Sequence, residues 1–224
     1  MKSELRHELL CLGARVFGVA GLQGHMNGEL AHLEIAVSIG VDRRLNEDTL
    51  SQLMKLQKHA VRFLKSRGYR TLAIPPDSDR QKGTFISKLY KLFTHKMAAT
   101  SAGIGWIGKN GLLISPDYGP RLSLVTVLTD APLEPDGPME RSLCGDCMLC
   151  VQYCPSQAIT GAEWSRISPF VELVNLSACR SHKATKRATD GKPNCGLCIN
   201  ICPYGRKESD SHNAEEKKPA REQC

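Results

Sequence analysis

Two short runs of cysteine near the C-terminal end constrain this chain more than any other feature of its sequence. Eight of the ten cysteines lie between Cys144 and Cys202. The first run reads C-G-D-C-M-L-C-V-Q-Y-C-P from Cys144, and the second reads C-G-L-C-I-N-I-C-P from Cys195. Scattered disulfides are typical of secreted chains, whereas CxxC spacings in an intracellular chain indicate metal. The clustering therefore predicts a local metal-binding module.

The spacing of the first run is the C-x2-C-x2-C-x3-C-P pattern of bacterial ferredoxins, which bind [4Fe–4S] clusters. In two-cluster ferredoxins the last cysteine of each run binds the cluster of the other run. The second run lacks one nearby cysteine, and Cys179 upstream can supply it. We therefore assign two ligand groups: Cys144, Cys147, Cys150 and Cys202 for cluster one, and Cys179, Cys195, Cys198 and Cys154 for cluster two.

A pair of zinc sites is the alternative interpretation of these cysteines. Zinc also takes four cysteine ligands arranged as CxxC pairs. However, zinc motifs rarely hold three cysteines as C-x2-C-x2-C followed by C-P, so the spacing favours iron–sulfur clusters. Cys11 and Cys224 lie outside the pattern, and we expect Cys11 to be a small buried residue of a helix.

The chain before the cysteine module alternates helical and strand patterns. We expect helices over 3–15, 47–67 and 94–101, and strands over 16–20, 33–41, 70–74, 112–115 and 122–129. Residues 131–138 carry three prolines and are a candidate linker. We predict an α+β protein with an α/β cofactor-binding domain over 1–138, a two-cluster ferredoxin-like domain over 139–205 and a polar tail over 206–224.

A glycine-rich stretch inside the first domain contains Gly103, Gly105 and Gly108 as G-x-G-x-x-G. A helix is expected before it and a strand after it, which is the reverse of a dinucleotide-binding fingerprint. Such a loop could bring the backbone close to a bulky ligand, and Lys109 in a stretch without Asp or Glu would favour an anionic group. A simple packing turn is equally compatible. Trp106 fits either a stacking residue or a core residue.

Net charge limits the classes of partner that the protein can have, and hydropathy limits its cellular location. The formal net charge is +7, and residues 180–192 hold five Lys or Arg against one Asp. Such basic segments suit nucleic acid, an anionic cofactor or an acidic partner protein. The charged N-terminus has no signal-peptide core, and no apolar run approaches the ~18 residues of a membrane span. We expect a cytoplasmic protein without a membrane partner.

Several of these motifs together resemble those of epoxyqueuosine reductases, a family that is similar to reductive dehalogenases. They are A-G-I-G-W-I-G-K-N from Ala102, L-I-S-P-D-Y-G from Leu113, the pair Thr129-Asp130 and both cysteine runs. The resemblance implies a nitroreductase-like α/β domain that binds a corrinoid, with FMN as the alternative, and two clusters that feed electrons to it. It also implies that the cofactor is bordered by Gly103, Gly105, Trp106, Gly108, Lys109 and Asn110.

The sequence also departs from that family. The family's enzymes are longer and carry an aspartate upstream of the glycine loop, whereas residues 88–95 here contain no carboxylate. Tyr90 and His95 are the candidates for proton transfer in that stretch, and Asp130 is a third. A lone histidine in a helix is more often structural, and an aspartate after a strand often shapes the next turn.

The leading hypothesis is an iron–sulfur reductase with a corrinoid or flavin on the N-terminal domain. It would receive electrons from a donor such as ferredoxin or flavodoxin. The rival hypothesis is a non-catalytic electron carrier that docks on a partner enzyme through residues 180–192 and reduces the cofactor of that partner. A third hypothesis is tRNA binding, which the basic segments permit but no aromatic-interleaved motif supports.

Overall fold

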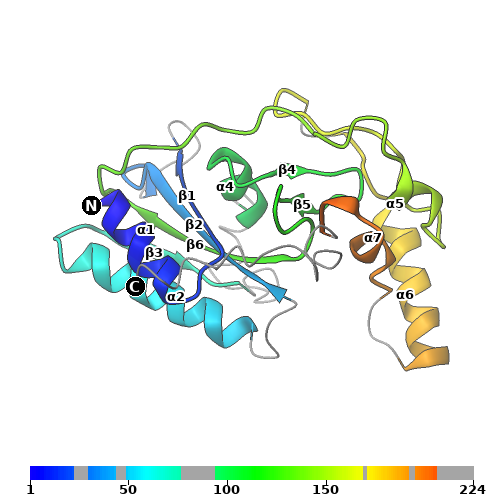
Figure 1. Cartoon of the computed structure of the whole chain (residues 1–224), viewed down its shortest axis with the longest axis horizontal. Helices are drawn as coiled ribbons and strands as arrows, with labels where there is room; N and C mark the ends of the chain where they lie inside the picture. The colour runs from blue at the N-terminus through cyan, green and yellow to red at the C-terminus, as the bar shows by residue number, and fades with distance from the viewer. Residues whose placement is uncertain (23–29, 44–48, 77–93, 169–170, 192–194, 206–224) are drawn as a thin grey trace, which may run out of the picture. The chain divides into compact units, whose positions relative to one another are not determined.

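The computed structural model describes residues 1–22, 30–43, 49–76, 94–168, 171–191 and 195–205. These residues form two compact units (Figure 1). The first contains the described residues of 1–104 and 122–138, and the second contains those of 105–121 and 139–205. Each unit is described separately below.

The first unit is built on a four-stranded sheet with the order β1-β2-β6-β3. These strands are β1 (Val16–Gly21), β2 (Ile35–Asp42), β3 (Thr71–Ile74) and β6 (Leu122–Thr129). Every neighbouring pair is antiparallel. The long central strands β2 and β6 are buried almost throughout, so the core of the unit is organised around them.

The two faces of the sheet carry different side chains because strand residues alternate between faces. Val19, Val37 and Val127 lie in one register row and pack in the main apolar core with helices α1 (Lys2–Cys11) and α2 (Thr49–Lys65). The neighbouring row contains Gly18, and a Cβ built on it would lie 2.7 Å from the carbonyl oxygen of Ala102. Small residues on this second face therefore let helix α4 (His95–Ser101) approach the sheet closely.

Helix α2 provides most of the cover for the first face. Its buried apolar residues recur at helical spacing, and they are Leu53, Leu56, Ala60, Phe63 and Leu64. Gln57 is also buried, and its Nε2 donates to the carbonyl oxygens of Ile74 and Thr126, both at 2.8 Å. The helix is therefore joined to β3 and β6 by hydrogen bonds as well as by apolar contact.

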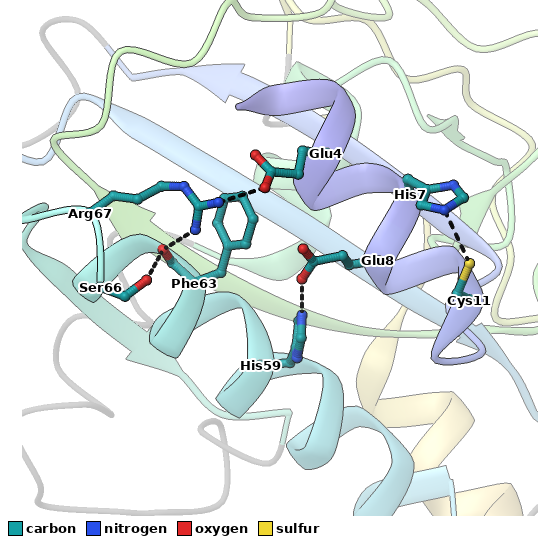
Figure 2. Close-up of polar contacts among 8 residues, drawn as sticks. All are labelled: Glu4, His7, Glu8, Cys11, His59, Phe63, Ser66 and Arg67. Atoms are coloured by element: carbon teal, nitrogen blue, oxygen red, sulfur yellow. Dashed lines mark hydrogen bonds and ion pairs between the residues drawn. The ribbon is translucent and has the colours of Figure 1, made fainter. Parts of the chain in front are cut away.

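Polar contacts on the outer side of α2 connect it to α1 (Figure 2). Arg67 Nη2 lies 2.6 Å from Glu4 Oε1, and His59 Nε2 lies 2.6 Å from Glu8 Oε2. The Arg67 guanidinium also lies 3.6 Å from the centre of the Phe63 ring. These partly exposed pairs contribute little free energy, about 0.2–1 kcal/mol each, and they add to the apolar contact of Leu5 and Leu9 with the core.

The expected burial of Cys11 is wrong. Cys11 lies on the exposed side of α1, with its Sγ 3.7 Å from His7 Nε2 (Figure 2). The buried residues of this helix are Leu5 and Leu9. Because each helical residue turns by about 100°, a side chain two residues after Leu9 points roughly away from the core.

The proline-containing segment 131–138 is packed against the first unit. Leu133 is buried in the main core, and Asp136 exchanges hydrogen bonds with Val19. The Asp136 amide donates to the Val19 carbonyl at 2.8 Å, and the Val19 amide donates to Asp136 Oδ2 at 2.8 Å. The segment expected to be a linker therefore covers the outer edge of β1 and occupies its unpaired backbone groups.

The second unit has little regular structure. Its elements are β4 (Trp106–Ile107), β5 (Leu113–Ile114), α5 (Leu149–Gln152), α6 (Leu176–Asp190), α7 (Leu197–Asn200) and the 3-10 turn η4 (Pro203–Gly205). Its core contains Trp106, Ile114, Trp164 and Cys202. This shared core explains why residues 105–121, which we expected in the first domain, cluster with the cysteine module.

None of the helices in the described part of the chain is both long and apolar enough to cross a membrane.

We expect the core position Leu56 to matter far more than Leu50 on the same helix. Leu56 is fully buried, whereas Leu50 is 52% exposed. Leu56→Ala should lower the free energy of unfolding by about 2–5 kcal/mol through lost burial and a residual cavity. The matched control Leu50→Ala should change it by no more than about 0.5 kcal/mol. Thermal and urea unfolding followed by circular dichroism measure both, and equal losses would contradict the assigned orientation of α2.

Candidate functional site

The cluster-one cysteines meet around one small cavity in the second unit. Cys144, Cys147, Cys150 and Cys202 line it together with apolar side chains, including those of Ile114 and Leu149. The first three come from a tight loop that leads into α5, in which the Cys147 amide donates to the Cys144 carbonyl at 3.1 Å. Four thiols spread around a space suit a four-iron cube, because each thiolate then binds a different iron.

The cluster-two cysteines are also brought together. The Cys198 thiol interacts electrostatically with the thiols of Cys179, Cys195 and Cys154. Cys179 lies in the first turns of α6, and Cys198 lies in α7 behind Gly196. Gly196 has a φ of +69°, a conformation that glycine adopts without strain. Each group thus draws one cysteine from the opposite run.

Neighbouring thiols, both within a group and between the two groups, disfavour one another's ionisation. Burial, followed by the neighbouring Cys144, Cys147, Cys198 and Cys202, raises the pKa of Cys150 to about 11. Burial also raises the pKa of Cys198 and of Cys202, and nearby thiols add to both shifts. A cationic centre reverses this effect, because coordination to metal deprotonates a thiol outright. Thiolates at these positions therefore need a positive charge among them, which bound iron would supply.

Cys154 differs from the other thiols with shifted pKa values. Although burial acts in the opposite direction, hydrogen bonds from the Ser156 hydroxyl and from backbone amides lower its pKa. The Ala158 amide donates to Cys154 Sγ at 3.3 Å. Hydrogen bonds of this kind stabilise a thiolate and are a recognised means of tuning an iron–sulfur centre.

Lys109 and Asn110 connect the two cysteine runs. Lys109 is 5% exposed, and its Nζ donates to the carbonyl oxygens of Gly145 at 2.6 Å and Cys147 at 3.3 Å. The Glu163 carboxylate lies 3.6 Å from the same Nζ. Asn110 Nδ2 donates to the Cys198 carbonyl at 3.2 Å. Of these two consecutive side chains, Lys109 therefore holds the loop of the first cysteine run and Asn110 holds that of the second.

The surroundings fit an iron–sulfur cluster. Within the described ranges no three His, Cys, Asp or Glu side chains converge as they would on one metal ion. The four cluster-one thiols line a cavity whose other walls are mostly apolar. Trp106 is buried in the apolar cluster that includes Cys202, and its Nε1 has no acceptor among the described residues. A buried N–H without a protein partner is uncommon and is compatible with an acceptor that the chain does not itself supply.

The glycines of the G-x-G-x-x-G stretch are explained by packing within the chain. A Cβ on Gly103 would lie 2.5 Å from the Gly137 carbonyl oxygen, and one on Gly105 would lie 2.1 Å from the Ile114 carbonyl oxygen. A Cβ on Gly108 would lie 2.7 Å from the Ile114 side chain. The geometry therefore favours the packing turn over the close approach to a ligand. Trp106 is likewise a core residue, 1% exposed.

Two of the candidates for proton transfer, His95 and Asp130, lie in different surroundings. His95 is buried, with Nδ1 2.8 Å from Thr126 Oγ1 and Nε2 3.0 Å from the Pro75 carbonyl oxygen. Asp130 is exposed, and its Oδ1 accepts from the Arg70 amide at 2.8 Å. Both arrangements favour structural roles. His95 joins α4 to β6, and Asp130, which follows β6, binds the backbone of the residue that precedes β3. Tyr90 lies outside the described residues.

Sequence reasoning missed two residues that support the first cysteine loop. Tyr204 donates from its hydroxyl to the Leu143 carbonyl at 2.9 Å and packs edge-on against Trp106, with ring centres 4.8 Å apart. Glu163 forms the ion pair with Lys109. The position of Tyr204 directly after the second C-P pair was an available signal, whereas nothing near Glu163 in the sequence indicates its partner.

Comparison with known proteins identifies the cysteine module. Residues 143–205 match the family model described as a 4Fe-4S double cluster binding domain. This match supports iron–sulfur clusters over the zinc alternative for the eight cysteines.

Sequence relatives confirm the expected resemblance. The chain is 37% identical to epoxyqueuosine reductase from Listeria monocytogenes over 124 residues, which are 54% of this chain and 32% of that enzyme. It is 32% identical to tetrachloroethene reductive dehalogenase from Dehalobacter restrictus over 128 residues, which are 51% of this chain and 23% of the relative. The chain thus spans about a third or less of these curated relatives.

Solved structures extend the likeness of the fold. An epoxyqueuosine reductase from Bacillus subtilis matches with a TM-score of 0.64 and 20% identity, covering 99% of this chain and 69% of that chain. A catabolic reductive dehalogenase matches with a TM-score of 0.64 and 18% identity, covering 88% of this chain and 31% of that chain. The chain therefore carries a 4Fe-4S double cluster binding domain and resembles epoxyqueuosine reductases, in sequence over about half its length and in fold over nearly all of it.

Proposed function

We propose that this chain is an iron–sulfur oxidoreductase that passes single electrons through two [4Fe–4S] clusters. The observation that carries the proposal is the arrangement of eight thiols as two groups of four, each of which takes one cysteine from the opposite run. The match to a double cluster binding domain supports it independently. When bound, such clusters supply one-electron transfer at potentials between about −700 and +450 mV.

The chain's own residues prepare this chemistry. The cluster-one cysteines would hold iron in a cavity with apolar walls, which would limit the access of water. The buried ammonium group of Lys109 lies against the backbone of the loop that carries Cys144 and Cys147. Its positive charge would offset part of the negative charge of the thiolates and the cluster. Because a nearby cation favours the reduced, more negative state of a cluster, we expect Lys109 to raise the reduction potential of cluster one.

We propose further that the first unit holds the acceptor of these electrons, a corrinoid or, as the alternative, FMN. The resemblance to epoxyqueuosine reductases and reductive dehalogenases supports this, as does the likeness of fold across the first unit. The nitroreductase-like character of that unit, the donor and a cytoplasmic location belong to the same proposal. One similar structure is an epoxyqueuosine reductase with an epoxyqueuosine-modified tRNA stem loop, so a tRNA substrate is a reasonable first test.

A second candidate function is favoured by one observation. Lys109 and Asn110 were expected beside the cofactor from the resemblance alone, whereas their side chains hold the cysteine loops. A chain that binds clusters but no further cofactor would be an electron carrier for a partner enzyme. Titration of the anaerobic holoprotein with cobalamin and with FMN separates the two. Stoichiometric binding, followed by reduction through the clusters, supports the reductase, whereas absence of binding supports the carrier.

The ligand groups predict the iron content of paired variants. Cys144→Ala with Cys202→Ala removes two ligands of cluster one, so about four of about eight irons should remain. Cys144→Ala with Cys154→Ala removes one ligand from each cluster, and little iron should remain. Iron and sulfide analysis measures both, with Cys11→Ser as the control that should keep all of its iron. The reverse order of the two double variants would show that each run binds its own cluster.

Lys109 should be needed for retention of cluster one. Lys109→Met leaves the Gly145 and Cys147 carbonyls without their buried donor and the Glu163 carboxylate without its cation. Loss of such outer contacts typically lowers metal affinity by about 10–100-fold. The rate of iron release to a chelator should therefore rise, while the exposed control Lys58→Met on α2 should release iron as the parent does. Equal release from both variants would contradict the assigned role.

A further inference from the structure

Helix α6 is the longest helix among the described residues of the second unit (Figure 1), and it runs over 15 residues. Like the shorter helices α5 and α7, it has no fully buried residue. Asn175 caps its start by accepting from the Ala178 amide at 3.0 Å, and Gly191 ends it in a left-handed conformation. Cys179 of the cluster-two group lies within its first turns. The helix therefore supplies a candidate cluster ligand without burying a side chain fully, and its residues are half-buried or exposed.

The exposed surface of α6 is strongly basic. Arg180, Lys183 and Arg187 follow Leu176 at intervals of four, three and four residues, so all four lie along one face. The helix contains a single acidic residue, Asp190, which pairs with Lys186 at 3.1 Å. Across the described part of the chain, no carboxylate forms an ion pair with the three cations of this face. Their charge is therefore available to a partner.

Exposed apolar side chains lie next to the cluster-two cysteines. Leu176 is 58% exposed and precedes Cys179 by about one turn. Leu197 is 44% exposed and directly precedes Cys198, and Tyr153 is 59% exposed and directly precedes Cys154. Large apolar side chains left in solvent near one another mark surfaces for protein contact. This feature is independent of the charge on α6 and favours a protein over a nucleic acid.

We propose that the basic face of α6, with the apolar residues beside cluster two, is the docking surface for a small acidic one-electron carrier protein. The inference rests on the proposed function and adds the point of electron entry and the chemistry of the donor. One electron would pass from the reduced centre of the carrier to the iron held by the cluster-two cysteines, with no bond made and no proton transferred. The cations would attract the acidic carrier, and Cys179 would be a cluster ligand on the helix that the carrier covers.

The test uses the full-length holoprotein and a photochemically reduced plant-type [2Fe–2S] ferredoxin as the acidic donor. Lys183→Glu with Arg187→Glu reverses two charges on α6. The matched control is Lys55→Glu with Lys58→Glu, which makes the same change on the exposed side of α2. Stopped-flow absorbance should show that the α6 variant is reduced about tenfold or more slowly at low ionic strength. The α2 control should be reduced at the rate of the parent protein. At high salt the reduction rates of all three proteins should become similar, because salt screens the charges.

The remaining outcomes separate the inference from the function on which it rests. Iron content and reduction by a small uncharged reductant should be the same in all three proteins. Clusters that reduce chemically, combined with an unchanged ferredoxin rate or with equal slowing in both variants, would overturn the docking surface alone. Absence of reducible clusters in the parent would overturn the proposed function as well. Loss of affinity for a tRNA anticodon stem loop, with the ferredoxin rate unaffected, would reassign the face to RNA.

Discussion

The close approach of four thiols within each group is the constraint on which the second unit depends. Burial and neighbouring thiols raise the pKa of Cys150 to about 11, so without a metal centre the fold opposes the ionised form that binds iron. Other groups of the chain fix the positions of the cysteine loops. Lys109 and Asn110 each hold the backbone of one cysteine run, and Trp106 and Ile114 form a core with Cys202. The loops are thereby held in place by side chains that do not themselves bind metal.

Support of the cysteine loops by Lys109 and Asn110 gives the glycine-rich stretch a structural role, whereas its G-x-G-x-x-G pattern first suggests ligand binding. Gly105 and Gly108 allow the β4–β5 hairpin to close against Ile114, and the hairpin carries Lys109 and Asn110 to the cysteine loops. The residues 105–121 therefore belong physically to the cysteine module although they precede it in sequence. A motif shared with a corrinoid enzyme family can thus be explained in this chain by support of the clusters.

Periodicity was sufficient to predict most of the first unit. The strand expected over 122–129 has those bounds in the structure, and the helix expected over 47–67 is α2, with Leu53, Leu56 and Leu64 on its buried side. Cysteine spacing likewise predicts which thiols the structure brings together. Helix α6 could not be found in this way because it buries no residue and so has no apolar stripe. The contacts of Lys109 were equally hidden, since its acceptors are backbone carbonyls that no side-chain pattern marks.

The central claim is that this chain binds two four-iron clusters, and anaerobic metal analysis tests it most directly. The purified full-length protein should contain about eight irons and about eight acid-labile sulfides per chain, as two cubes require. Reduction should then produce the electron paramagnetic resonance of two nearby clusters. About two zinc ions per chain without sulfide would contradict the account, because the same cysteines would then form zinc sites.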